Sequence, residues 1–385
     1  MKILITSTSA ISTPPVSYGG LEWIAYNSGE EMAKLGHEVT IITTNDSPKL
    51  GIHEVVDEQG KSLGGVLDVK TAGPTGWGIN HERDMYTNYR EFMEVNYGSG
   101  QGVVFDHSWF GYPYLSQKGA REYLVGDGAI EIKPHPELKI VHVVHGTTGL
   151  GGVKPQVMWP RLVGVSTRQA AYLSAQFGFP VRHIHNGIDI PPKPEQWPLT
   201  DEGYLLSLNR ISREKGIMSA IDIAVANGYH IKVAGDYSWV ANQDYVYEVM
   251  TRCEESGGLA EFVGNVDNET KWNLIRHCKA MIACPDIRQN YVEAFGLYAV
   301  EAGVMGKPLI ALLNGGLYDI IQDNVNGIMA DNPEQLKQRL ALLDWNQFNP
   351  DTIRTMAERF SVANMGMAYL KMAEGVMNGA PEYRW

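Results

Sequence analysis

Short apolar runs alternate with longer amphipathic stretches from one end of the chain to the other. In the first half the runs predict strands at 2–6, 37–44, 102–107, 139–146 and 162–166, and the stretches predict helices at 21–36 and 167–177. Parallel strands covered by helices on both faces appear in a sequence as such continuous apolar runs. The pattern therefore predicts an α/β fold with a parallel sheet.

The same alternation begins again in the second half. It predicts strands at 204–210, 229–236, 260–266, 280–285, 308–312 and 327–330, and helices at 216–228, at 268–278 and from about 296. A Pro-rich segment at 186–198 separates the two series and is typical of a linker. We therefore expect two doubly wound domains, residues 1–187 and 188–360, and a C-terminal helix within 361–385 that packs back on the first domain. Residues 60–100, rich in Gly, Asn and Tyr, predict no definite element.

Composition excludes several classes of protein. The 385 residues suffice for two cores, and no apolar run approaches the roughly 18 residues of a membrane span. The first ten residues lack the long apolar region of a signal peptide, and the three cysteines lack CxxC spacing, which together favour the cytoplasm. A net charge of −12 argues against nucleic acid as a partner.

The first loop, "SAISTPPVSYGGLEW", lies between the first strand and the first helix, where ligands bind in open α/β sheets. Gly19 and Gly20 permit close backbone approach, and the following helix offers free N–H groups to an anion. The glycines could equally serve the geometry of the turn alone. Their spacing is not G-x-G-x-x-G, which disfavours an NAD-dependent dehydrogenase.

The segment "SLNRISREKG" forms the corresponding loop of the second domain. Arg210 follows the strand and Lys215 precedes the helix, so two cations could bind a diphosphate and stabilise charge on a leaving phosphate. From the residues alone Arg213 is as good a candidate as Arg210. A solvated surface loop is the alternative.

Four residues at or near strand ends of the first domain could contact a ligand. His145 ends the strand in "VVHG", while Asp106, His107 and Trp109 lie in "FDHSW". Histidine can bind a sugar hydroxyl or transfer a proton near neutral pH, and Asp106 is the acidic candidate for an acceptor base. A hydrogen-bonded core histidine is the commoner role of a single His.

Two carboxylates, Glu293 and Glu301, bracket the segment "EAFGLYAVE". In a continuous helix they would lie about 12 Å apart along the axis, beyond the roughly 5–9.5 Å of glycosidase pairs. We expect the helix to begin near Gly296, with Glu293 in the preceding loop. The pair then suits two contacts along one extended ligand, although an ordinary helix with an acidic first turn is the alternative.

Six segments occur in the order seen in retaining glycosyltransferases of family 4. They are the Gly-Gly before the first helix, "VVHG", "HNGID", "NRISREKG", "EAFGLYAVE" and "NGGLYDIIQDNVNG". Over nearly its whole length the sequence resembles this family, whose GT-B fold has two Rossmann-like domains facing a cleft. The resemblance implies an acceptor-binding first domain, a donor-binding second domain and a C-terminal helix that crosses back to the first.

The resemblance also implies roles for individual residues. The donor would be a UDP- or GDP-sugar, with no obligatory metal or other cofactor. Arg210 and Lys215 would hold the diphosphate, Glu301 the ribose, and Glu293 the donor sugar; the remaining donor contacts would come from Gly20, His145, Ala294, Phe295, Gly296 and Leu297. The family's reaction is usually described as front-face, with the leaving phosphate helping to deprotonate the acceptor. Glu293, His145, Arg210 and Lys215 are therefore the expected catalytic residues.

The acceptor side is defined less closely. Asp106, His107 and Trp109 are its candidate residues, and the acceptor could be a sugar, a glycan, a lipid-linked molecule or another small molecule. Two other functions stay open: a nucleotide-sugar epimerase of the same fold, and a non-catalytic nucleotide-sugar binding protein. The epimerase would need an acid/base cluster that the sequence does not display, whereas a binding protein would not need all four expected catalytic residues.

Overall fold

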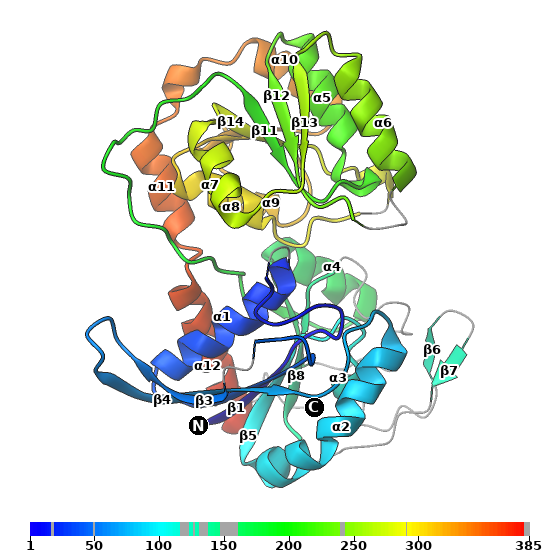
Figure 1. The fold of residues 1–385 in the computed structure, drawn as a ribbon, viewed down its shortest axis with the longest axis vertical. Helices are drawn as coiled ribbons and strands as arrows, with labels where there is room; N and C mark the ends of the chain where they lie inside the picture. Colours follow the sequence, from blue (N-terminus) through cyan, green and yellow to red (C-terminus); the bar gives the residue numbers. More distant parts are fainter. Residues whose placement is uncertain are drawn as a thin grey trace. The chain divides into compact units, whose positions relative to one another are not determined.

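The computed structural model describes residues 1–16, 19–48, 51–115, 123–125, 128–130, 138–146, 161–238, 243–289 and 291–380. The chain divides into two compact units (Figure 1). The first comprises Met1–Gly187 together with the C-terminal segment from Val362, and the second comprises Ile188–Ser361. The first unit is therefore built from two separate stretches of sequence.

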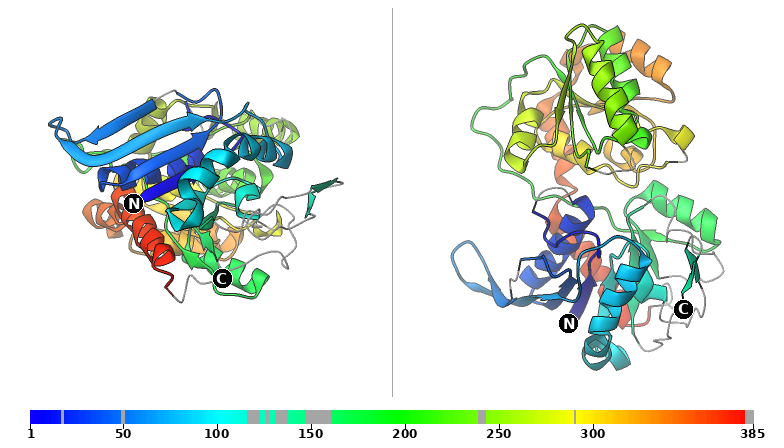
Figure 2. Two further views of the ribbon diagram at one scale, coloured as in Figure 1. Left: turned by 90° about the horizontal axis from the view of Figure 1, so that it is seen from below. Right: turned by 45° about the vertical axis from the view of Figure 1, so that its right-hand side comes forward.

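The first unit contains an eight-stranded sheet in the order β10-β9-β8-β5-β1-β2-β4-β3. All neighbouring strands are parallel except β3 and β4, which form an antiparallel hairpin at the edge (Figure 2). The strands are β1 (Lys2–Thr6), β2 (Glu38–Thr43), β3 (Gly51–Val56), β4 (Ser62–Thr71), β5 (Gly102–Asp106), β8 (Ile140–Val144), β9 (Leu162–Gly164) and β10 (Arg182–His183), and a separate pair is formed by β6 (Tyr123–Val125) and β7 (Gly128–Ile130).

Helices cover both faces of this sheet. Leu4 and Val104 pack toward α2 on one face, and Ile5 and Ile41 lie against α1 on the other. This alternation follows from the two-residue period of a strand. The helices of the unit are α1 (Gly20–Lys34), α2 (Ile79–Tyr97), η1 (Gly98–Gly100), α3 (Tyr112–Leu115), α4 (Thr167–Phe177) and α12 (Val362–Met377).

The C-terminal helix α12 is part of the first unit and lies beside α1 (Figures 1 and 2). Gly366 allows the close approach, because a Cβ there would lie 2.5 Å from the Cβ of Glu31. Tyr369 is fully buried and packs edge-on against Phe105 of β5, with ring centroids 5.0 Å apart. Helix α12 thus completes the core on the α1 face of the sheet.

The second unit contains a six-stranded, wholly parallel sheet in the order β13-β12-β11-β14-β15-β16. Its strands are β11 (Leu205–Leu208), β12 (Ile231–Ala234), β13 (Ala260–Gly264), β14 (Ala280–Ala283), β15 (Leu309–Leu312) and β16 (Gly327–Ala330). Its helices are η4 (Arg213–Lys215), α5 (Ile217–Ala226), α6 (Gln243–Glu254), α7 (Asn268–His277), η6 (Ile287–Gln289), α8 (Leu297–Val304), α9 (Leu317–Ile320), α10 (Pro333–Ala341), η7 (Trp345–Gln347) and α11 (Pro350–Glu358).

Every strand predicted for the second half is present, so the predicted α/β class with two parallel sheets is confirmed. Residues 60–100, for which the sequence predicted nothing definite, contain β4, α2 and η1.

The two ends of the second unit lie together, because the Ile188 N–H donates to the Phe360 carbonyl at 3.0 Å and Ile188 forms a β-bridge with Ser361. Within the described part of the chain, no helix has the length and apolar character needed to cross a membrane.

Candidate functional site

The loops that follow β11 and β14 lie at the switch point of the second sheet, where the strand order reverses. Ligands of open α/β sheets bind outside the carboxyl ends of strands at such a point. The first loop carries Arg210 and Lys215, and the second leads through Glu293 into α8. The topology therefore brings together segments that lie far apart in the sequence.

Lys215, Tyr291, Glu293 and Tyr298 form one hydrogen-bonded group, which we call the Lys215 cluster. The Lys215 Nζ donates to Glu293 Oε2 at 2.8 Å and to the Tyr291 hydroxyl at 2.6 Å. The Tyr291 hydroxyl donates to Glu293 Oε1 at 3.1 Å, and the Tyr298 hydroxyl donates to Oε2 at 3.3 Å. The Lys215 and Glu293 side chains are only 15% and 7% exposed, so this ion pair is largely desolvated.

The partners of Lys215 determine its protonation. Burial alone would lower the pKa of the amine, but the Glu293 carboxylate and the Tyr291 oxygen outweigh burial and raise the pKa. Burial, reinforced by the same carboxylate, raises the pKa of Tyr291. Lys215 therefore stays an ammonium, and the Tyr291 and Tyr298 phenols stay neutral, throughout the physiological pH range.

An Asn-Gly-Gly turn after β15 fixes the backbone of Glu293. The Asn314 side chain accepts a hydrogen bond from the Glu293 N–H at 2.8 Å, and the Gly316 N–H donates to the Glu293 carbonyl at 2.7 Å. Gly315 has φ +49°, and a Cβ there would lie 2.0 Å from the Glu293 carbonyl oxygen. Glycine is therefore required at this position, both by conformation and by space.

Gly216 has a similar function on the other side of the cluster. It has φ +63° between η4 and α5, and a Cβ there would lie 1.7 Å from the Cys284 carbonyl oxygen. The turn that carries Lys215 can therefore pack directly on the end of β14 only because residue 216 has no side chain.

Helix α8 begins at Leu297, with Gly296 at φ +99° before it, so the predicted start near Gly296 is confirmed. Phe295 is buried against Phe360, and hence offers only its backbone to a ligand. The first turn of a helix has N–H groups without intrahelical acceptors. Here that turn begins immediately after Gly296, so its free N–H groups lie next to the Ala294–Gly296 backbone. Glu301 lies within α8 and pairs with Lys271 at 2.8 Å.

The two arginine candidates have different partners. Arg210 donates to Glu214 at 2.7 Å within the loop after β11. Burial would raise the pKa of Glu214, but hydrogen bonds from Ser212 and Arg210 outweigh burial and lower it. Arg213 instead pairs with Glu248 and covers the Tyr245 ring, both on α6. Arg210 therefore stays the diphosphate candidate, and Arg213 joins the loop to α6.

In the first unit, the sheet order reverses between β1 and β5, and the candidates after β5 and β8 lie next to each other. His107 Nδ1 and His145 Nε2 are 2.9 Å apart. Burial, with the nearby imidazole of His142, lowers the pKa of His145 to about 3. His145 is therefore neutral at physiological pH, so it can donate or accept a hydrogen bond but cannot be a cationic acid.

Asp106, the predicted acceptor-side base, is held by hydrogen bonds within the core of the first unit. Its side chain is completely buried, and it accepts hydrogen bonds from the Thr6 hydroxyl, the His142 ring and the backbone N–H groups of Ser108 and Tyr114, at 2.7, 3.1, 3.1 and 3.3 Å. Those donors saturate both oxygens and tie together the ends of β1, β5 and β8. His107 is also fully buried, so it does not face an acceptor directly.

Trp109 differs from the other two acceptor-side candidates because it is 37% exposed. Its ring lies 5.4 Å from that of Trp77 and lies over Gly146, where an added Cβ would be 3.4 Å from the indole. In the same unit, the buried Glu82 carboxyl group accepts a hydrogen bond from the Phe110 N–H at 2.8 Å, and burial raises the pKa of Glu82 to about 8. Trp109 is therefore the acceptor-side candidate that a ligand can reach.

Gly20 is the first residue of α1, and Gly19 precedes it with φ +156°. A Cβ at Gly19 would lie 2.7 Å from Pro15, so the first loop closes tightly on the helix start. Thr8 of the same loop donates to the buried Glu22 at 2.6 Å. Gly20 therefore lies at the carboxyl edge of the first sheet, as expected of a loop that meets a ligand.

Sequence reasoning missed Tyr291, Tyr298, Asn314 and Glu82. Tyr291 and Tyr298 flank Glu293 closely in sequence, and their hydroxyls could have been recognised as donors to a buried carboxylate. Asn314 precedes the Gly-Gly pair that the sequence did single out. Glu82 gave no signal, because an acidic residue near a helix start is usually solvated.

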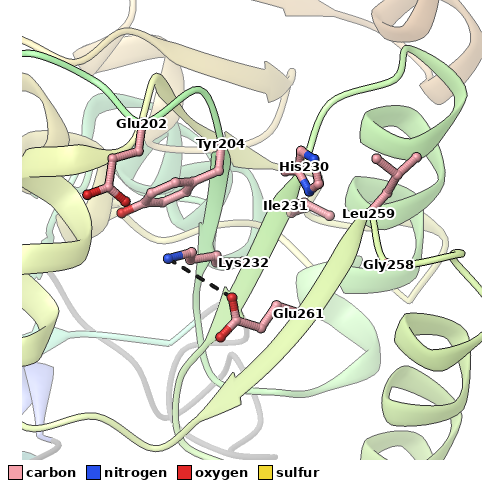
Figure 3. Close-up of a pocket in the computed structure, with 8 residues that line it drawn as sticks. All are labelled: Glu202, Tyr204, His230, Ile231, Lys232, Gly258, Leu259 and Glu261. Atoms are coloured by element: carbon pink, nitrogen blue, oxygen red, sulfur yellow. Dashed lines mark ion pairs between the residues drawn. The ribbon is translucent and has the colours of Figure 1, made fainter.

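A shallow pocket elsewhere in the second unit contains none of the predicted site residues. It lies at the amino ends of β11, β12 and β13, opposite the switch point, and is lined by Glu202, Tyr204, His230, Ile231, Lys232, Gly258, Leu259 and Glu261 (Figure 3). Lys232 pairs with Glu261 at 4.0 Å and covers the Tyr204 ring. These charges neutralise each other rather than converging on a ligand.

Two family models match the chain in succession. The one described as Glycosyltransferase Family 4 matches residues 18–190, and the one described as Glycosyl transferases group 1 matches residues 189–357. The two matched segments meet at the boundary between the two units. Both units therefore resemble glycosyltransferase domains.

Relatives and solved structures agree with these matches. Glycogen synthase of Mycobacterium tuberculosis is 24% identical over 372 residues, 85% of this chain and 82% of that protein. Sucrose-phosphate synthase from Thermosynechococcus elongatus superposes with a TM-score of 0.69 at 18% identity, over 99% of this chain and 100% of that one. The Anabaena protein HepE in complex with UDP-glucose superposes with a TM-score of 0.63 at 14% identity, over 97% and 100%. These superpositions establish a shared fold.

Proposed function

The chain belongs to the GT-B glycosyltransferases of the family 4 type, and from this premise we propose that it transfers a sugar from a UDP- or GDP-sugar to an acceptor hydroxyl with retention of configuration. The Lys215 cluster is the observation that carries the proposal. It places one buried cation and one buried carboxylate at the switch point of the second sheet.

A nucleotide-diphosphate sugar carries the groups that complement this pair. Its diphosphate is an anion and suits Lys215, while its sugar hydroxyls are donors and suit Glu293. In the absence of donor the two side chains neutralise each other, and on binding each one exchanges its partner for a group of the ligand. The exchange keeps both charges compensated, which matters because an unpaired buried charge is costly.

Other residues extend the proposed donor site. Arg210 lies in the same loop as Lys215 and is the second cation for the diphosphate, and Glu301 within α8 is the residue for the ribose. The backbone from Ala294 to Leu297 supplies N–H groups at the start of α8. Gly20 and His145 stay predicted donor contacts of the first unit.

The proposed reaction needs no protein nucleophile. The bond between the anomeric carbon and the diphosphate oxygen breaks, and the acceptor oxygen forms its bond on the same face of the sugar. The acceptor proton passes to an oxygen of the leaving diphosphate. Lys215, Arg210 and the N–H groups of α8 stabilise the charge on that leaving group, which is the function a metal ion would otherwise have.

A panel of UDP- and GDP-sugars tests this proposal. A donor present at 100 times its Kd should stabilise the folded protein by about 2.7 kcal/mol, which a thermal shift readily detects. The donor found in this way should then be hydrolysed or transferred with the anomeric configuration kept, as read by NMR of the product, and a chelator should leave the rate unchanged. No stabilisation by any nucleotide sugar would contradict the proposal, and an inverted product or strict dependence on metal would contradict the mechanism.

A further inference from the structure

A partly buried hydrogen bond joins two histidines at the carboxyl edge of the first sheet. His107 directly follows β5 and His145 directly follows β8. His107 Nδ1 and His145 Nε2 are 2.9 Å apart, while the ring centroids are 5.1 Å apart with an interplanar angle of 30°. The nearly coplanar rings therefore meet edge to edge, as a hydrogen bond between ring nitrogens requires.

Both rings are neutral, so one of them donates and the other accepts. Burial, together with the neighbouring imidazoles, lowers the pKa of both His107 and His145. A neutral imidazole carries its proton on one nitrogen only. The direction of this hydrogen bond consequently sets the tautomer of both residues.

The surroundings of His107 decide the direction. Its second nitrogen, Nε2, is buried and has no hydrogen-bond partner among the described residues. A proton on Nε2 would leave a buried N–H without an acceptor, which is rarer in proteins than an unpaired acceptor. We therefore assign the proton of His107 to Nδ1, where it is donated to His145.

His145 is then the acceptor through Nε2, and its own proton must lie on Nδ1. That nitrogen has no partner among the residues that the structure describes, and the His145 side chain is partly exposed. Gly146 follows it without a side chain, and a Cβ there would lie 3.4 Å from the Trp109 ring.

We propose that His107 is a positioning residue, which holds His145 in the Nδ1–H tautomer so that His145 donates a hydrogen bond to an oxygen of the bound substrate. The identity of that oxygen, a hydroxyl of a sugar, rests on the proposed function; the tautomer does not. A donor fixed in this way selects a substrate atom with a lone pair and excludes one that can only donate.

The tautomer can be measured directly in the intact protein labelled with ¹⁵N-histidine. Long-range ¹H–¹⁵N correlations distinguish the two neutral tautomers, and His145→Gln identifies the His145 signals among those of the 11 histidines. We expect the Nδ1–H form for His145 in the native protein. An Nε2–H form would overturn the proposal without any variant having to fold.

Two substitutions of His107 then test its positioning role. His107→Phe fills the same space without a donor, and should release His145 from the Nδ1–H form and lower kcat/KM about tenfold, the effect of one lost hydrogen bond. His107→Asn keeps an N–H near the position of Nδ1, and should restore the tautomer and most of the rate. Tyr369→Phe, which leaves the ring packed 5.7 Å from His107, is the matched control and should change neither.

The outcomes separate this inference from the proposed function. If His145 keeps the Nδ1–H form in His107→Phe, another group fixes the tautomer and the proposal is wrong. If the tautomers behave as expected and yet no nucleotide sugar is used, the proposed function fails while the assignment of His107 stands.

Discussion

The two sheets carry different kinds of cluster at their carboxyl edges. In the second unit, Lys215 and Glu293 hold opposite charges in a largely desolvated pair, and we propose that each of them binds a part of the donor. In the first unit, Asp106 is saturated by donors from its own unit, and the adjacent histidines are neutral. The Lys215 cluster is therefore suited to exchanging its internal partners for groups of a ligand, whereas the group around Asp106 is suited to keeping its hydrogen bonds.

The difference shows why a carboxylate at a strand end is not by itself evidence of catalysis. Asp106 and Glu293 are both buried acidic residues near the ends of parallel strands. Asp106 receives four hydrogen bonds from within its unit. The Glu293 carboxylate instead accepts hydrogen bonds from the Lys215 ammonium and from the hydroxyls of Tyr291 and Tyr298. The number and kind of donors around each carboxylate separates the structural role of Asp106 from the proposed binding role of Glu293.

The largest expected effect on activity comes from removing the cation of the Lys215 cluster. Lys215→Ala should lower turnover on the order of 10²- to 10³-fold, because the leaving diphosphate loses a buried charge. Steady-state kinetics with the donor found by thermal shift measures this. Arg213→Ala is the matched control, since Arg213 lies in the same turn but pairs with Glu248, and its rate should be nearly native. A folded Lys215→Ala enzyme with the native rate would place the diphosphate elsewhere.

A second substitution should affect stability far more than rate. Asp106→Asn turns one oxygen into an N–H donor that faces the Tyr114 N–H or the His142 ring, and should cost about 3 kcal/mol at pH 7. Urea unfolding measures this, and Asp351→Asn, at an exposed ion pair, should cost less than about 0.5 kcal/mol.

The pH dependence of the Asp106 contribution follows from its pKa. Burial would raise that pKa, but His142 and the other hydrogen bonds outweigh burial and lower it below the ordinary value of 3.8. A lowered pKa in the folded state means that the contribution is present above pH 3.8 and is lost as the pH falls through the folded pKa. The difference between native protein and Asp106→Asn should therefore shrink only in acid. Equal stability of the two at pH 7 would show that Asp106 is not a structural anchor.

The smallest expected effect, when it is measured over a single pH unit, concerns Glu82, whose pKa shifts in the opposite direction. Burial raises that pKa from 4.5 to about 8, so the folded state keeps a proton that the unfolded chain releases. Native stability should therefore fall relative to Glu82→Gln as the pH rises between these values, by at most about 1.4 kcal/mol per pH unit. Thermal unfolding across this range measures it, with the exposed Glu91 of the same helix as control in Glu91→Gln. Parallel curves for native protein and Glu82→Gln would contradict the buried, protonated state.

Much of the fold could be predicted because buried parallel strands leave a simple signal. The run at 2–6 coincides with β1, and the glycine at 296 correctly placed the start of α8. Helix α2 was missed because its buried face includes three tyrosines, Tyr86, Tyr89 and Tyr97, and tyrosine is a weak helix former that is also common in strands.

The candidate site was less accessible to prediction, because its contacts join distant segments. Lys215 and Glu293 are 78 residues apart, and no local pattern shows that they pair with each other before any ligand is present. The saturation of Asp106 depends on Thr6, 100 residues away, and on the register of three neighbouring strands. Sequence identified residue types that suit a nucleotide sugar, while burial and partners had to come from the structure.

The placement of α12 within the first unit has a consequence for how the gene can be divided. Codons 188–361 encode one unbroken segment whose ends meet at the Ile188–Ser361 bridge, so this half can be excised or exchanged as a cassette. The other half cannot, because a stop codon placed near position 361 would remove Tyr369 from against Phe105 and uncover α1. A truncation near the end of the reading frame would thus destabilise the core of the first unit, most of which is translated first.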